Sequence, residues 1–354
     1  MKLKLPKSKL RRTALAVSLV FCSIVVAVAA YAGYLMYKTD SALGRIAAPN
    51  SPSPSASSPN EPESPTEPKP QEERTEALTF LLAGVDQREG SGGTLNTDVI
   101  MLVSLNLNTR TASIVSLPRD MQLKPKTLSP HKANYYYAYF YGKDKETAIA
   151  NTKAFFSELF QLPIDYMAVI NFDGLRQLVD AVGGLTIDVD MDMKYRDNAD
   201  GTNIDLKKGL QELNGKQVLD FVRYRKSNGG TGPSSDIERN GRQQQVLTKL
   251  LDKLASFKGM AQWDDVIDIV GDNVRTDIPK SELRDWILHF RDMKPDSIRV
   301  IPLETRWESP YIYVDENDLT EAIDSLRTQA GLPPAADLEL ADVVSVDPSS
   351  DSAR

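Results

Sequence analysis

The chain has 354 residues, of which 41% are hydrophobic, and carries a formal net charge of -7. This length allows one large or two ordinary domains. The acidity argues against a general nucleic-acid-binding protein, which normally has basic excess over a broad face. The single cysteine, Cys22, excludes an internal disulfide and a cysteine-based metal site. Two histidines, His131 and His289, leave little material for zinc or Ser-His-Asp chemistry.

The N-terminus predicts a membrane anchor. Residues 1–12 carry six basic side chains and no acidic one, and residues 13–37 contain no charged residue. About 20 apolar residues suffice to cross a bilayer, and the positive flank stays in the cytoplasm. We therefore expect a cytoplasmic tail, a single transmembrane helix over 13–37, and an extracytoplasmic remainder of the chain. A cleaved signal peptide is the alternative, but its apolar region is usually only about 7–15 residues long.

Residues 38–76 are predicted to form an extracytoplasmic linker. Its proline-rich part, residues 49–76, alternates eight prolines with Ser, Glu and Asn. Such a segment cannot build a core and behaves as a semi-rigid polyproline-type spacer. At about 3.1 Å per residue it could hold a domain up to roughly 85 Å from the membrane.

The hydrophobic pattern of residues 77–330 predicts one α/β domain. Apolar runs bounded by turns predict strands, and apolar positions at helical spacing predict helices. The expected strands are residues 77–86, 98–107, 111–120, 166–172, 185–191, 297–303 and 311–314. The expected helices are residues 145–160, 172–182, 279–293 and 316–330. Strands mixed with helices in this way indicate an α-β-α sandwich, a central mixed sheet covered on both faces. The tail, 331–354, is rich in Pro, Ala, Asp and Ser and is predicted to be disordered.

A local excess of arginine stands out in this acidic chain. Ser235 and Glu238 form the pattern of a capping box, which predicts a helix beginning near Asp236. On a helical wheel, Arg239 and Gln243 fall at the centre of the apolar stripe that later leucines continue. Arg242 falls at the edge of this stripe.

A buried arginine is costly unless it is paired, so Arg239 predicts either a protein carboxylate or a bound anion as its partner. Helix N-termini favour anions, and guanidinium groups match phosphate geometry. Upstream, Arg223 and Arg225 would share one face if their segment is extended. Nearby Asp236 and Glu238 cannot neutralise four arginines. The alternative is a set of solvated arginines on a mobile loop.

Two aspartates flank a glycine-rich loop at the ends of expected strands. Asp86 ends the first strand and Asp98 begins the second. Two carboxylates without histidine or cysteine suit Mg²⁺, a hard cation that shares its coordination shell with phosphate oxygens. The alternative is ordinary, since aspartate is common in turns. Arg119 ends the next expected strand at a similar edge and can either join the site or pair with Asp120.

Seven segments, taken in order, resemble the LytR-CpsA-Psr family of cell-wall enzymes. They read GVDQRE, NTDVIMLVSLN, SIVSLPRD, HKAN, INFDGLRQLVDAVGGLTIDV, GLQELNGKQVLDFVRYRK and DIERNGRQQQVL. The resemblance covers about residues 78–257, and the ordered set is far more specific than any single segment. It implies an α/β sandwich that binds a polyprenyl-linked pyrophosphate and transfers an anionic glycopolymer, such as wall teichoic acid or capsule, to peptidoglycan.

The same resemblance implies roles for particular residues. Asp86 and Asp98 match the Mg²⁺-binding aspartates, and Asp236 matches an acidic position whose role, structural or basic, stays open. The positions that match pyrophosphate-binding residues are Arg119, Arg223, Arg225, Arg239, Arg242 and Gln243. The chain departs from the family in its longer arginine loop and in the aromatic run of residues 131–144. That run could stack on sugar rings or form a strand or loop packed on the sheet.

The function that we expect is therefore a membrane-anchored, Mg²⁺-dependent glycopolymer phosphotransferase with its domain outside the cell membrane. Mg²⁺ and the arginines would neutralise the pyrophosphate, and a peptidoglycan sugar hydroxyl would attack the phosphorus next to the polymer. Two alternatives stay open. One is an extracytoplasmic hydrolase that passes the same phosphorus to water. The other is a non-catalytic module that binds wall polymers or regulates the envelope.

Overall fold

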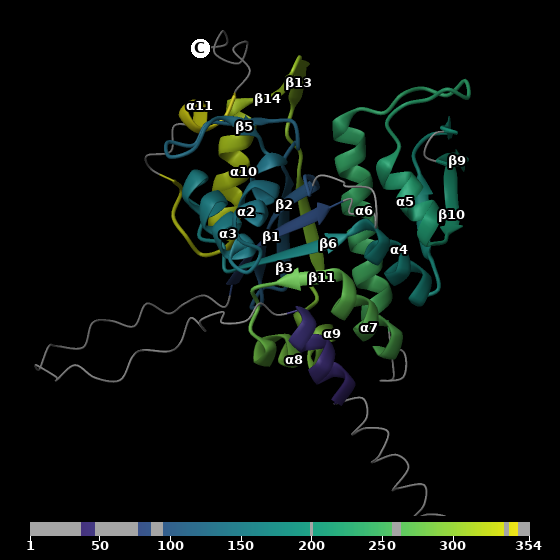
Figure 1. Ribbon diagram of the computed structural model, residues 1–354, viewed down its shortest axis with the longest axis horizontal. Helices are drawn as coiled ribbons and strands as arrows, with labels where there is room; N and C mark the ends of the chain where they lie inside the picture. The colour runs from purple at the N-terminus through teal and green to yellow at the C-terminus, as the bar shows by residue number, and fades with distance from the viewer. Residues whose placement is uncertain are drawn as a thin grey trace, which may run out of the picture.

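The computed structural model describes residues 37–46, 77–85, 95–198, 201–256, 263–335 and 340–345. Its centre is a mixed sheet of six strands in the order β11-β6-β1-β2-β3-β12 (Figure 1). The strands are β1 (Ala77–Val85), β2 (Thr97–Asn106), β3 (Thr111–Ser116), β6 (Tyr166–Asn171), β11 (Val274–Thr276) and β12 (Ser297–Ile301). β1 pairs antiparallel to β2 and parallel to β6, while β3 pairs parallel to β12. The predicted central mixed sheet is therefore confirmed.

Both faces of the sheet are apolar because its central strands alternate between two buried surfaces. In β1, Leu81 and Ala83 point into one core, and Phe80 and Leu82 border the other. A strand buried on both faces reads as a continuous apolar run rather than a polar-apolar alternation. This explains why residues 77–85 lack an exposed face in the sequence.

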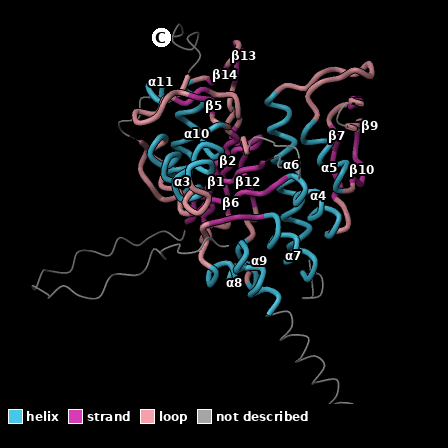
Figure 2. The backbone as a smooth tube through the Cα atoms, viewed as in Figure 1, coloured by secondary structure: helices cyan, strands magenta, loops and turns pink. Residues whose placement is uncertain are grey.

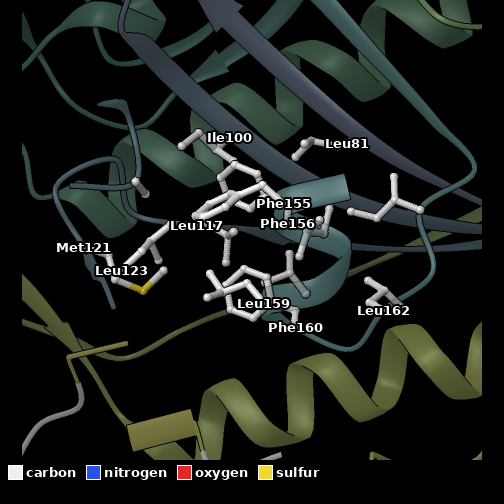
Figure 3. Packing of buried hydrophobic residues seen from close by; sticks show 14 of the residues in the cluster. Leu81, Ile100, Leu117, Met121, Leu123, Phe155, Phe156, Leu159, Phe160 and Leu162 are labelled. Carbon is white, nitrogen blue, oxygen red and sulfur yellow. The ribbon is translucent and has the colours of Figure 1, made fainter. Parts of the chain in front are cut away.

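Helices cover the first face of the sheet and form the larger core (Figure 3). They are α2 (Tyr135–Lys143), α3 (Ala148–Leu159), α10 (Glu316–Gln329) and the short α11 (Leu340–Val343). Phe155 and Phe156 of α3 pack toward Leu81 and Ile100 of the sheet. These helices lie together on one side of the strands in Figure 2.

The second face carries the long helix α6 and a further helical layer. Leu247 of α6 packs on Met101 and Ile114 of the sheet, and Val246 and Leu250 face a second apolar core beyond it. The helices on this side are α4 (Phe172–Ala181), α5 (Gly215–Arg223), α6 (Asp236–Ala255), α7 (Asp264–Asn273), α8 (Lys280–Leu288) and α9 (Phe290–Met293). The predicted α-β-α sandwich is thus confirmed.

Four small two-stranded sheets surround the sandwich (Figure 1). Their strands are β4 (Gln122–Leu123), β5 (His131–Lys132), β7 (Leu185–Val189), β8 (Met193–Arg196), β9 (Asn203–Leu206), β10 (Gly209–Leu213), β13 (Thr305–Glu308) and β14 (Tyr311–Val314). β7 follows α4, which ends at a turn where Gly183 and Gly184 adopt positive φ values of 80° and 85°. Glycine reaches this conformation without the strain that other residues would meet.

Residues 38–46, which the linker prediction included, form a helix instead. The helix of residues 37–46 lies against α7 and α8 (Figure 1), and Ala42, Leu43 and Ile46 are buried in this contact. This stretch has no proline, and its apolar residues share one side of a helix, which is why it packs. The proline-rich residues 49–76 lie outside the described residues. So do residues 13–36 of the predicted anchor, and no described helix is long and apolar enough to cross a membrane.

The prediction of a disordered C-terminal tail is wrong for residues 340–345. Leu340 and Val344 are 1% and 0% exposed and belong to the large core. Val344 also forms a β-bridge with Leu123, and the Ser345 amide donates to the Gln122 carbonyl over 3.1 Å. Composition suggested disorder because the tail is mostly polar, but two apolar residues and backbone hydrogen bonds suffice to attach it.

The aromatic run also differs from its predicted strand or loop, because Tyr135–Lys143 is the helix α2. Tyr136 is fully buried, and its ring stacks on Phe155 with centroids 4.2 Å apart. Tyr137 is buried as well, and this burial raises the pKa of its hydroxyl group to about 12. Much of this aromatic surface therefore belongs to the core.

Candidate functional site

The predicted start of α6 is confirmed. The Ser235 hydroxyl accepts a hydrogen bond from the Glu238 amide at 3.1 Å, and the Glu238 carboxylate accepts one from the Ser235 amide at 2.7 Å. This capping box satisfies amide groups that the first turn leaves without intrahelical partners. Arg239 begins the second turn of this helix.

Three arginines from separate parts of the chain meet at one end of the sheet. Arg239 comes from α6, Arg225 follows α5, and Arg119 follows β3. Arg239 is only 9% exposed. Its burial, followed by the positive charges of Arg225 and Arg119, lowers the pKa of Arg239 to about 10. The same two causes, burial and then Arg119, lower the pKa of Arg225.

Two carboxylates lie among these arginines. Asp98, the second residue of β2, forms an ion pair with Arg119, which also reaches Asp120 at 3.4 Å. Lys132 of β5 donates to Asp120 at 2.8 Å. Burial alone would raise the pKa of Asp120, but the Lys132 hydrogen bond and the charges of Arg119 and Arg225 outweigh it, so this pKa is lowered.

We call these residues the arginine cluster: Asp98, Arg119, Asp120, Lys132, Arg225 and Arg239. Among the described side chains, four cations face two carboxylates, so this described part of the cluster has excess positive charge although the whole chain is acidic. Like charges held close in a partly desolvated place repel strongly. An anion bound among them would relieve this repulsion, and phosphate groups match guanidinium geometry.

Two clefts border the segment that carries Arg225. The first has a volume of about 350 Å³ and is lined by Arg225, Lys226, Ser234 and Ser235, with Thr305, Trp307 and Ile312 of the β13–β14 hairpin opposite. The second, of about 220 Å³, lies between Arg225 and residues of β8 and β9 and includes Arg223 and Asp220. A third pocket, of about 690 Å³, lies between α10 and the β3–β12 edge and contains no residue of the arginine cluster. Pocket volume alone therefore does not indicate the functional site, whereas the gathering of positive charge does.

Arg242 has a protein carboxylate as its partner. It is 3% exposed, and its Nε and Nη2 atoms donate to the two oxygens of Asp190 at 2.8 and 2.6 Å. Its Nη1 atom donates to the Ser234 hydroxyl at 2.9 Å. The sequence placed Arg242 at the edge of the apolar stripe and did not find Asp190, which lies 52 positions earlier. Its predicted role in pyrophosphate binding stays a prediction.

The remaining predicted residues occupy different surroundings. Arg223 ends α5, and its guanidinium lies 5.5 Å from the ring centre of Phe172. Because only Arg223 is helical while Arg225 lies beyond the helix, the two do not share an extended strand. Gln243 is half-buried, whereas its neighbour Gln244 is buried and donates to the Ser116 hydroxyl at 2.9 Å. Because three glutamines follow one another in the sequence, the sequence did not show which of them forms the hydrogen bond between α6 and β3.

The site of the predicted Mg²⁺ is described only in part. Asp86 lies outside the described residues, and Asp236 is described in its backbone alone. Val85, which precedes Asp86, pairs with Thr97, so β1 ends beside the strand that carries Asp98. Within the part of the chain that the structure describes, no three His, Cys, Asp or Glu side chains form a group able to hold a metal.

Fold and site together define an α/β sandwich protein with a cluster of cationic side chains near the N-terminus of α6. The profile of the LytR_cpsA_psr family matches residues 47–328. The chain belongs to this family, as the ordered segments predicted.

Named relatives and a solved structure agree with this assignment. The chain is 30% identical over 239 residues to the polyisoprenyl-teichoic acid–peptidoglycan teichoic acid transferase TagU of Oceanobacillus iheyensis, covering 66% of this chain and 69% of that relative. It is 30% identical over 261 residues to the Bacillus anthracis transferase of the same name, covering 72% and 80%. The crystal structure of Bacillus subtilis TagV superposes with a TM-score of 0.56 at 25% identity, covering 73% of this chain and 99% of that one.

Proposed function

We propose that this protein is a phosphotransferase that moves an anionic glycopolymer, such as wall teichoic acid, from a polyprenyl-pyrophosphate carrier to peptidoglycan. The observation that carries the proposal is the convergence of Arg119, Arg225 and Arg239 beside a cleft at the N-terminus of α6. The relatives named as teichoic acid transferases support the choice of polymer and acceptor.

The arginine cluster supplies the electrostatic part of this reaction. Arg239 and Arg225 would bind the pyrophosphate oxygens, and Arg119, freed from Asp98 or shared with it, would add a third donor. Donors fixed before the reaction stabilise charge that develops on the leaving polyprenyl phosphate. The burial of Arg239 strengthens this effect because water screens its charge less than it would at the surface.

We further propose that Asp98, together with Asp86, holds Mg²⁺ against the same phosphate groups. When bound, the ion would neutralise phosphate charge and align the phosphorus for attack. Asp98 already lies next to Arg119, so a carboxylate and a guanidinium are available at one place to a metal and a phosphate respectively. The membrane anchor over residues 13–37 remains part of the proposal and would place the domain outside the cell.

The proposal is tested with the purified full chain in detergent or liposomes. A polyprenyl-pyrophosphate donor whose polymer carries a radiolabel is mixed with peptidoglycan, with Mg²⁺ or with EDTA. We expect label to become covalently attached to peptidoglycan, and to do so only with Mg²⁺. Release of soluble labelled polymer at an equal rate without peptidoglycan would identify a hydrolase. Binding without turnover would identify a non-catalytic module.

A further inference from the structure

Ion pairs on two sides attach the helix of residues 37–46 to the domain. Lys38 reaches Asp264 and Asp268 of α7, both at 2.7 Å, and Arg45 reaches Asp272 at 3.1 Å. On the other side, Asp40 pairs with Lys280 of α8 at 2.8 Å and with Arg284. The two hydrogen bonds that Lys38 donates to the α7 carboxylates raise the pKa of Lys38 well above its usual value.

Between these charges the contact is apolar and close. Ala42, Leu43 and Ile46 are at most 3% exposed. Gly271 of α7 makes room for Ala42, because a Cβ atom on Gly271 would lie only 3.0 Å from the Cβ of Ala42. A side chain at position 271 would therefore force the two helices apart. This packing indicates a specific, closely fitted contact rather than a loosely placed segment.

The docked helix begins where the predicted transmembrane segment ends, since residue 37 belongs to both. No spacer therefore separates the expected membrane span from the domain. The proline-rich residues 49–76 come after the docked helix and before β1. They connect two parts of the chain that already meet on the domain, so their length does not set a distance from the membrane.

Two large apolar side chains are exposed at the same end. Asp40 contacts Lys280 and Arg284, and Gly44 lies near Lys280, so the helix runs antiparallel to α8. One further turn of the docked helix toward its N-terminus brings Tyr37 to the C-terminal end of α8, where Leu288 lies. Tyr37 is 75% exposed and Leu288 is 62% exposed. Tyrosine is enriched at membrane–water interfaces, where its ring lies at headgroup level.

We propose that residues 37–46, docked on α7 and α8, hold the domain directly on the membrane, with Tyr37 and Leu288 against the lipid headgroups. This goes beyond the proposed function and rests on the predicted anchor over residues 13–37. It replaces a freely tethered domain with one whose orientation on the bilayer is set. The end of the molecule formed by this helix and α8 is then the membrane-facing end (Figure 1).

The docking is tested by cross-linking in the full chain reconstituted into liposomes. In a Cys22→Ser background, Asp40→Cys and Lys280→Cys should be joined by a short bifunctional thiol cross-linker in most molecules, because the native side chains at these positions form an ion pair at 2.8 Å. The control pair combines Asp40→Cys with Leu210→Cys, on the exposed strand β10, and should not be joined. Equal cross-linking of the two pairs would refute the docking.

The membrane contact is tested with a fluorescent probe. Leu288→Cys and Leu210→Cys, both exposed leucines, are labelled in turn, and quenching by lipids spin-labelled near the headgroup is measured. We expect several-fold stronger quenching at position 288. Adding Leu43→Ser and Ile46→Ser should release the domain and reduce quenching at 288 to the level at 210.

Equal quenching at positions 288 and 210 in the otherwise unchanged chain would overturn the membrane contact. A chain that fails to sediment with the liposomes would overturn the anchor on which the contact rests. Neither measurement involves polymer transfer, so failure of the proposed function would leave these results unaffected.

Discussion

Arg242 holds Asp190 with two parallel hydrogen bonds, of 2.8 and 2.6 Å, on the same helix that presents Arg239 to the arginine cluster. The two arginines are three residues apart and both buried, but their electrostatic surroundings are opposite. Arg242 is bound by a carboxylate, whereas burial and two further arginines lower the pKa of Arg239 more than the described carboxylates Asp98 and Asp120 raise it. One arginine is therefore suited to stabilise the fold, and the other to bind an anion.

Arg239→Ala should weaken pyrophosphate binding without destabilising the ligand-free protein. A hydrogen bond to a charged group is worth roughly 1.5–3 kcal/mol, or about 10- to 100-fold in affinity. With a folded pKa of about 10, Arg239 stays protonated at neutral pH, so its burial opposes folding there and this cost is relieved only as pH rises past 10. Calorimetric titration with a polyprenyl pyrophosphate and thermal unfolding of the free protein measure both effects. Lower stability with unchanged affinity would show that Arg239 is structural.

Arg242→Ala should lower the free energy of unfolding by about 1–3 kcal/mol, because Asp190 and Ser234 lose a buried donor. Asp190 is 40% exposed and can regain water, which favours the lower part of this range. Urea unfolding of Arg242→Ala, Asp190→Ala and the double variant gives the coupling energy. Additive effects of the two single changes would contradict a stabilising pair.

Asp98→Asn should leave the fold intact and remove Mg²⁺-dependent transfer, since an amide is a neutral and weaker ligand for a hard cation. The measurement is the rate of label transfer to peptidoglycan across a Mg²⁺ titration, with circular dichroism as the check of folding. Asp190→Asn is the matched control, because that carboxylate is not part of the arginine cluster. Full activity of Asp98→Asn at ordinary Mg²⁺ concentrations would remove Asp98 from the metal site.

The contribution of Asp120 to the free energy of unfolding should decrease at acid pH. Its folded pKa is below the ordinary value of 3.8, so the contribution is present above about pH 4 and is lost as pH falls through the folded pKa. The difference in free energy of unfolding between the native protein and Asp120→Asn should therefore be constant from pH 5 to 7 and shrink below about pH 4. Urea titrations at several pH values measure it, and a difference that grows toward acid pH would reverse the assigned sign.

Leu340→Ala should destabilise the domain by about 2–5 kcal/mol, the usual cost of truncating a buried leucine. Leu340 is 1% exposed in the large core, although it belongs to the segment that composition predicts to be disordered. Leu210→Ala, at a position 73% exposed, is the control and should change stability by no more than about 0.5 kcal/mol. Equal stability of both variants in chemical unfolding would show that the C-terminal helix does not support the core.

Much of the architecture was predictable because it depends on local patterns. The buried strand of residues 77–85, the capping box at Ser235 and the glycine stop after α4 each follow from a few neighbouring residues. The ordered family segments also indicated the family without any knowledge of contacts. Periodicity predicted the burial of Arg239, because a helical face is set by spacing alone.

Only the tertiary structure decided which charges meet. Asp190 reaches Arg242 across 52 residues, and Arg119 and Arg239 come together although 120 positions separate them in the sequence. It also decided that residues 37–46 and 340–345 pack on the domain, since a short apolar stripe in a polar segment becomes informative only once a complementary surface exists. The sequence by itself determined the central strands, the helices with clear apolar periodicity and the kinds of charged group available. Their partners depend on distances through space, which the order of residues along the chain does not contain.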